Sequence, residues 1–114
     1  MDTPNWYWKK GLHDAKITNW KIENLDYDYS QRNPVRNCIT VELDAKLAMF
    51  DTTIKKIKFL NAKLIQGNEP CVDWFWKYDS IQKKHTGYEI EIVLTLHRET
   101  KKIKIAFESI IVER

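Results

Sequence analysis

Apolar and polar residues alternate along two long stretches of the chain. In residues 39–49 every odd position is apolar, and the even positions of 40–46 carry polar or charged side chains. The same alternation runs through residues 88–96. A period of two places one face of a β-strand in a core and the other face in solvent. Both stretches are therefore predicted to be strands of an antiparallel sheet.

Shorter alternations predict further strands. Residues 15–30 fit either one long, bulged strand or two short ones. In residues 57–64 the apolar phase shifts by one position, and in residues 103–112 it shifts near Glu108 and Ser109. A β-bulge produces a shift of this kind. Each of these two stretches is therefore predicted to be one bulged strand.

Residues 71–84 fit two interpretations. Trp74, Trp76 and Tyr78 alternate as on a strand, whereas Trp74, Tyr78 and Ile81 have the spacing of one helix face. The run of large aromatic residues favours a strand as far as Tyr78. Residues 31–37 are polar and contain an Asn-Pro pair, which predicts a turn.

The first residues carry the signals of a short helix. Thr3 can cap the helix, Pro4 suits the first helical position, and Gly11 can end it. No other segment is long enough for the helical crossover of a parallel sheet. The predicted fold is mainly β: an antiparallel curved sheet, a small sandwich or a partly open barrel, with five or six strands and one short N-terminal helix.

Length and composition set limits on the class of protein. The chain has 114 residues and a net charge of +3, and residues 1–114 are predicted to form one β-rich domain. No apolar region typical of a signal peptide or of a membrane span occurs, so we expect a cytoplasmic protein that does not enter a membrane. Cys38 and Cys71 lack the spacing of a metal or redox motif, so both are expected to be reduced thiols.

The pair His13-Asp14 is the main candidate for metal chemistry. The two other histidines, His85 and His97, have no further histidine or cysteine at ligand spacing, and a zinc site needs three or four ligands. A structural role is therefore favoured, in which Asp14 turns the backbone and His13 forms a local hydrogen bond. No nucleophile motif or glycine-rich phosphate loop occurs either. We expect no catalytic residue, metal or cofactor.

Aromatic residues are the most unusual feature of the composition, with 5 Trp, 5 Tyr and 4 Phe. Consecutive aromatic residues cannot all face one core, so some are expected at the surface. We predict Trp6, Trp8, Phe75 and Trp76 as contact residues, since exposed aromatic side chains anchor protein interfaces. They are also stacking platforms for sugars or bases. The alternative is that these side chains fill both faces of a thin sheet.

Lysines and acidic residues share the polar faces of the predicted strands. Because the two signs are interleaved, we expect cross-strand attraction and a solvated sheet face, and no nucleic-acid surface. The residues concerned are Lys56, Lys58, Lys102 and Lys104, with Glu42, Asp44, Glu89 and Glu91.

The segment from Gly11 to Ile17 resembles the "HDxxI" opening of several small bacterial domain families, some of which are immunity proteins of polymorphic toxin systems. The segments 74–81, 87–90 and 107–110 are similar to the rest of that pattern. The resemblance implies a cytosolic, non-enzymatic, β-rich protein that binds another protein. It assigns no functional residues.

The expected function is therefore that of a protein-binding domain, of the immunity type that neutralises a partner toxin. The alternative is a β domain that binds a carbohydrate or a nucleic acid on its aromatic residues. Exposed strand edges also make a homodimer a possible assembly.

Overall fold

The computed structural model describes residues 12–27, 34–46, 48, 52–67 and 72–114, which form eight strands and no helix. The predicted helix between Thr3 and Gly11 lies outside these residues. The strands are β1 (Lys16–Tyr27), β2 (Pro34–Asp44), β3 (Lys56–Leu60), β4 (Lys63–Gln66), β5 (Phe75–Lys84), β6 (Gly87–Leu96), β7 (Glu99–Phe107) and β8 (Ser109–Glu113).

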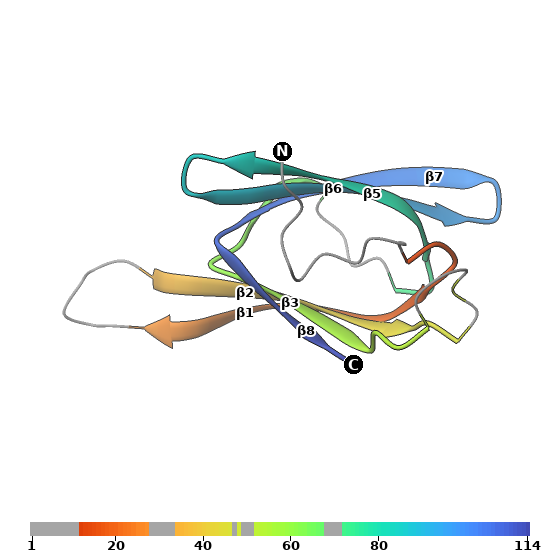
Figure 1. Ribbon diagram of the computed structural model, residues 1–114, viewed down its shortest axis with the longest axis horizontal. Helices are drawn as coiled ribbons and strands as arrows, with labels where there is room; N and C mark the ends of the chain where they lie inside the picture. The colour runs from red at the N-terminus through yellow and green to blue at the C-terminus, as the bar shows by residue number, and fades with distance from the viewer. Residues whose placement is uncertain (1–11, 28–33, 47, 49–51, 68–71) are drawn as a thin grey trace.

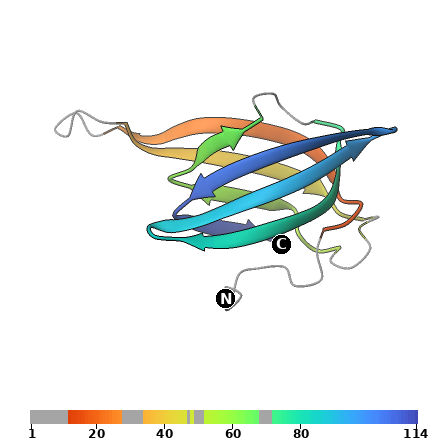
Figure 2. The same cartoon turned by 90° about the horizontal axis from the view of Figure 1, so that it is seen from above.

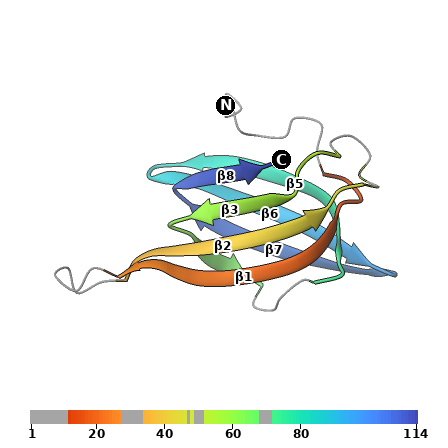
Figure 3. The ribbon, with the colours of Figure 1, turned by 90° about the horizontal axis from the view of Figure 1, so that it is seen from below.

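The eight strands form one antiparallel sheet in the order β4-β7-β6-β5-β1-β2-β3-β8. The sheet folds over itself, so that β5, β6 and β7 lie above β1, β2, β3 and β8 (Figure 1). Figures 2 and 3 show these two layers from above and from below. We call β1, β2, β3 and β8 the lower layer, and β5, β6, β7 and the β4 strand paired with β7 the upper layer.

Two bends connect the layers on one side. Asn61, with φ 49°, separates β3 from β4, and Glu108 separates β7 from β8. The bends lie side by side, because the Glu108 amide donates to the Leu60 carbonyl at 3.1 Å. In the lower layer β3 pairs with β8, and in the upper layer β4 pairs with β7. The same two stretches of chain therefore contribute to both layers.

The core lies between the layers and consists of the inward positions of both. Phe107 of the upper layer packs edge-on against Phe59 of the lower layer, with 5.0 Å between ring centroids, and Tyr88 stacks on Phe107 at 5.7 Å. Burial of apolar surface between the layers is the main stabilising term. The largest fully buried side chains are Trp76, Phe59, Leu12, Ile17, Ile39, Ile54, Ile57, Ile90, Ile92, Leu94, Ile103 and Ile105.

The prediction of a mainly β, antiparallel fold is confirmed, but the number of strands is wrong. The two stretches predicted as single bulged strands are each divided by a bend, at Asn61 and at Glu108, which raises the count to eight. Residues 15–30 contain one long strand with register shifts, which was one of the two alternatives. The predicted turn 31–37 is partly wrong, because β2 begins at Pro34.

The outer faces of both layers carry paired charges. On the lower layer Lys56 lies 3.3 Å from Glu42 and 3.8 Å from Glu113. On the upper layer Lys104 lies 3.8 Å from both Glu89 and Glu91. These are exposed or half-exposed pairs, each of which contributes about 1 kcal/mol or less. Their role is to keep the solvent faces of the sheet polar.

Candidate functional site

The first residues of β5 are fixed to the segment that leads into β1. The Asp14 amide donates to the Trp76 carbonyl, and the Trp76 amide donates to the Ala15 carbonyl, both at 2.8 Å. The Ile17 amide donates to the Trp74 carbonyl at 2.9 Å. Asp14 reaches its position in a turn with φ 73°. This pairing links the start of β5 in the upper layer to the start of β1 in the lower layer.

A β-bulge follows at Lys77. Trp76 pairs with Leu94 of β6, but the next partner of β6, Val93, pairs with Tyr78. The Nδ1–H group of His13 donates to the Lys77 carbonyl at 2.5 Å. A bulge leaves a residue outside the ladder, and here His13 supplies a partner for its carbonyl group. The bulge shifts every later residue of β5 by one position.

The shift brings two aromatic side chains onto the same outer face. Phe75 pairs with Thr95 and Tyr78 pairs with Val93, and these two partners lie two residues apart on one face of β6. Tyr78 is 57% exposed, whereas Phe75 is half-buried. Val93 between them is buried, although it points away from the core. We call the surface formed by Phe75, Tyr78 and Val93 the β5 aromatic face.

The sequence pattern did not predict Tyr78 as a surface residue of this kind. Strict alternation grouped it with Trp74 and Trp76, on the face opposite to Phe75. Only the bulge reverses that grouping. The Lys77 carbonyl at the bulge is bonded to His13, 64 residues away in the sequence, and no local pattern reveals such a contact.

Trp76 lies in the core, which contradicts its predicted role as a contact residue. Its exposed fraction is 0%, and its indole N–H donates to the Asp79 carboxylate at 2.8 Å. A side chain that is fully enclosed cannot contact a partner without unfolding of the strand. Phe75 lies on the outer face, and Trp6 and Trp8 lie outside the described residues.

His13 and Asp14 occupy structural positions next to this face. The sequence predicted a local hydrogen-bond partner for His13. The partner is instead the Lys77 carbonyl of β5, which is distant in the sequence. The Nε2 atom of His13 lies 3.6 Å from the Asp14 carboxylate. Among the described residues, no three metal-ligating side chains form a group.

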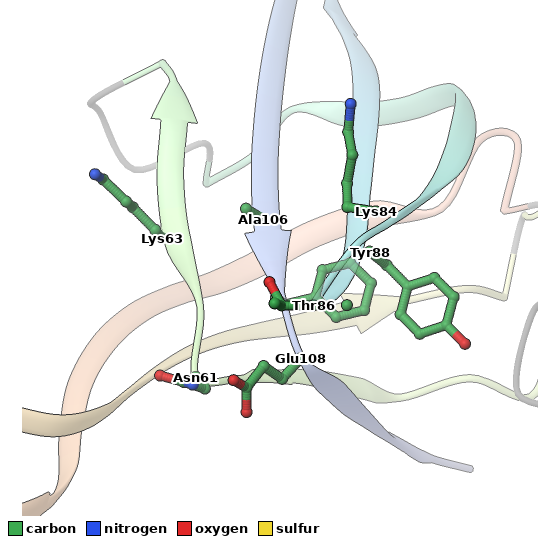
Figure 4. A pocket seen from close by; sticks show the side chains of 9 residues that line it. Asn61, Lys63, Lys84, Thr86, Tyr88, Ala106 and Glu108 are labelled. Carbon is green, nitrogen blue, oxygen red and sulfur yellow. The ribbon is translucent and has the colours of Figure 1, made fainter.

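A hollow of about 210 Å³ lies where the bends meet the β5–β6 turn. Figure 4 shows that Lys63 and Lys84 stand apart, while Asn61 and Glu108 lie near each other at the bend. The Lys84 ammonium group is 3.9 Å from Glu89. Because its charged groups do not converge, this hollow has no arrangement that would select a ligand.

A second hollow, of about 230 Å³, lies on the outer face of the lower layer. Its lining includes the small side chains of Cys38 and Thr40, with longer side chains such as Lys58 and Leu60 around them. Cys38 is a buried, free thiol whose sulfur lies 3.4 Å from the Thr40 hydroxyl. The other cysteine, Cys71, lies outside the described residues.

Comparison with known proteins adds no assignment. No family model matches the chain, and searches of curated proteins and of solved structures find no similar protein. Within the ranges described above, no helix is long and apolar enough to cross a membrane.

Proposed function

We propose that this domain binds another protein through the β5 aromatic face and performs no catalysis of its own. We further propose that it is an immunity-type protein, which neutralises a partner toxin in the cytoplasm by covering it. The observation that carries the proposal is the exposed Tyr78 beside Phe75 on one outer face of the sheet. Aromatic side chains on a rigid support are typical anchors of protein interfaces.

The surroundings of Tyr78 favour a protein over a stacked sugar or base. The ammonium group of Lys77 lies over the Tyr78 ring, 5.6 Å from its centroid. A planar ligand that stacks on this face of the ring would have to displace that cation and its cation–π attraction. A protein partner can instead contact the ring edge, the hydroxyl group and Phe75 together.

The test is comparative capture from a lysate of the source cells. Wild-type protein, Tyr78→Ala and Ile111→Ala are immobilised in parallel, and the bound proteins are quantified by mass spectrometry. Ile111 is the matched control, because it is also exposed but lies on the outer face of the lower layer. We expect one protein to bind wild type and Ile111→Ala and to be depleted about tenfold or more on Tyr78→Ala.

The immunity role requires a second measurement with the captured protein. Its expression alone should arrest growth, and co-expression of this domain should restore growth. Tyr78→Ala should restore growth less well than Ile111→Ala does. Equal capture by all three variants would contradict binding at this face. A captured protein that leaves growth unchanged would contradict the immunity role alone.

A further inference from the structure

We infer that the partner presents carboxylate groups to the β5 aromatic face, because two lysines near Tyr78 form no ion pair with any acidic residue that the structure describes. This inference rests on the proposed function and adds the chemistry of the partner to it. The lysines are Lys77, which precedes Tyr78 on β5, and Lys102 on β7.

Strand pairing locates one of these cations relative to Tyr78, and a contact with the ring locates the other. Tyr78 pairs with Val93, and Val93 pairs with Lys102, so the three residues form one row across β5, β6 and β7. The Lys102 side chain is exposed on this outer face. The Lys77 ammonium group, which belongs to β5 like Tyr78, lies over the Tyr78 ring. The apolar residues Tyr78 and Val93 therefore lie next to two positive charges, one from β5 and one from β7.

Neither charge is neutralised within the described part of the chain. Lys104, two residues after Lys102 on the same face, lies 3.8 Å from Glu89 and Glu91. No such ion pair occurs for Lys77 or Lys102 among the described residues. Covering these cations with an uncharged surface would remove them from water without compensation, which is costly. Carboxylates on the partner would remove that cost and accelerate association.

The same face argues against a nucleic acid as the source of negative charge. Glu91 lies in the next row, opposite Ser80 on one side and Lys104 on the other. A phosphate backbone needs a continuous series of cations, and here the series would meet Glu89 and Glu91 directly. The total excess of three positive charges is also small. A few carboxylates around an apolar anchor, as on a protein surface, fit the pattern better.

The experiment is selection from a library of random peptides displayed on phage. Phage that bind the immobilised wild-type domain are then passed over immobilised Tyr78→Ala, and phage that bind this variant are discarded. The retained peptides therefore depend on the β5 aromatic face. Their Asp and Glu content is compared with that of the unselected library. The retained peptides are then tested on Lys102→Glu and on the control Lys58→Glu, which reverses a charge on the outer face of the lower layer.

We expect the retained peptides to be enriched in Asp and Glu next to apolar residues. Their recovery should fall about fivefold on Lys102→Glu and stay unchanged on Lys58→Glu. Peptides that depend on Tyr78 but show no acidic excess, or bind Lys102→Glu equally well, would overturn the inference and leave protein binding standing.

A single-stranded oligonucleotide serves as the competing probe. If it binds wild type and is lost on both Tyr78→Ala and Lys102→Glu, the negative charge comes from phosphate and the inference is overturned. A library that yields no Tyr78-dependent peptide also overturns the inference. The capture experiment tests the proposed function separately.

Discussion

Trp76 and Tyr78 are separated by one residue on β5 and lie in opposite environments. Trp76 is enclosed by the core and bonded to Asp79, whereas more than half of the Tyr78 side chain is in contact with solvent. Large aromatic residues contribute to stability when buried and to binding when exposed. Trp76 therefore contributes to the stability of the core, and Tyr78 is accessible to the proposed partner.

Alanine substitution separates the two roles. Trp76→Ala is expected to lower the free energy of unfolding by about 3–5 kcal/mol, because it removes a large buried side chain. Tyr78→Ala should change it by only about 0.5 kcal/mol, since its side chain is mostly exposed. Urea unfolding of both variants measures the difference. Equal destabilisation by the two substitutions would contradict the assignment of Tyr78 to the surface.

Gly87 marks a close approach between the β5–β6 hairpin and the second bend. With φ 155°, it occupies a conformation that side chains rarely adopt, and a Cβ atom there would lie 2.3 Å from the Phe107 carbonyl oxygen. Gly87→Ala should therefore cost about 2–3 kcal/mol of stability.

Gly67→Ala is the control for this prediction. Gly67 also has a positive φ, of 86°, but the nearest atom to its Cβ would lie at 3.4 Å. Backbone strain alone should cost about 1–2 kcal/mol there. If thermal unfolding shows Gly87→Ala to be the milder change, the close approach to Phe107 is not as described.

At the scale of elements, β5 shows how far alternation predicts a strand and where it fails. The pattern correctly favoured a strand over a helix as far as Tyr78, although β5 continues to Lys84, and it predicted that Phe75 and Trp76 face opposite sides. It could not predict the bulge, whose Lys77 carbonyl is bonded to His13, far away in the sequence. β6, which has no register shift against β7, follows its predicted alternation throughout.

His13 is expected to stabilise the β5 bulge. His13→Leu removes the donor to the Lys77 carbonyl, at a cost of about 1 kcal/mol. His13→Asn keeps an N–H donor near the position of Nδ1 and should retain most of the bulge. NMR contacts across β5 and β6 report the register directly, because Tyr78 pairs with Val93 only when the bulge is present. Unchanged contacts and amide exchange in His13→Leu would show that the bulge does not need His13.

At the scale of the whole molecule, the two bends turn one sheet into two packed layers. At both places the alternation of apolar positions in the sequence shifts by one residue, and this shift alone predicted a bulge. The structure has bends instead, because β3 and β8 pair below them and β4 and β7 pair above them. Phase changes locate such positions, but only long-range pairing distinguishes a bulge from a bend.

The shared core predicts that the layers unfold together. Ile90, Ile92 and Ile105 of the upper layer and Ile39 and Ile57 of the lower layer belong to one buried cluster. Native-state hydrogen exchange should therefore give the same opening free energy for amides of β6 and of β2. Measurable opening of β6 at a denaturant concentration that leaves β2 protected would contradict a single cooperative core.

Photocrosslinking from position 78 in the source cells tests directly whether the β5 aromatic face binds a partner protein. A photoreactive phenylalanine analogue replaces Tyr78 in one variant and Ile111 in a second, so that each outer face is probed separately. Binding at the β5 aromatic face should give one discrete crosslinked protein from position 78 and none in common with position 111. Crosslinking to that protein from position 111 alone, or none from position 78, would contradict the assignment of the binding surface.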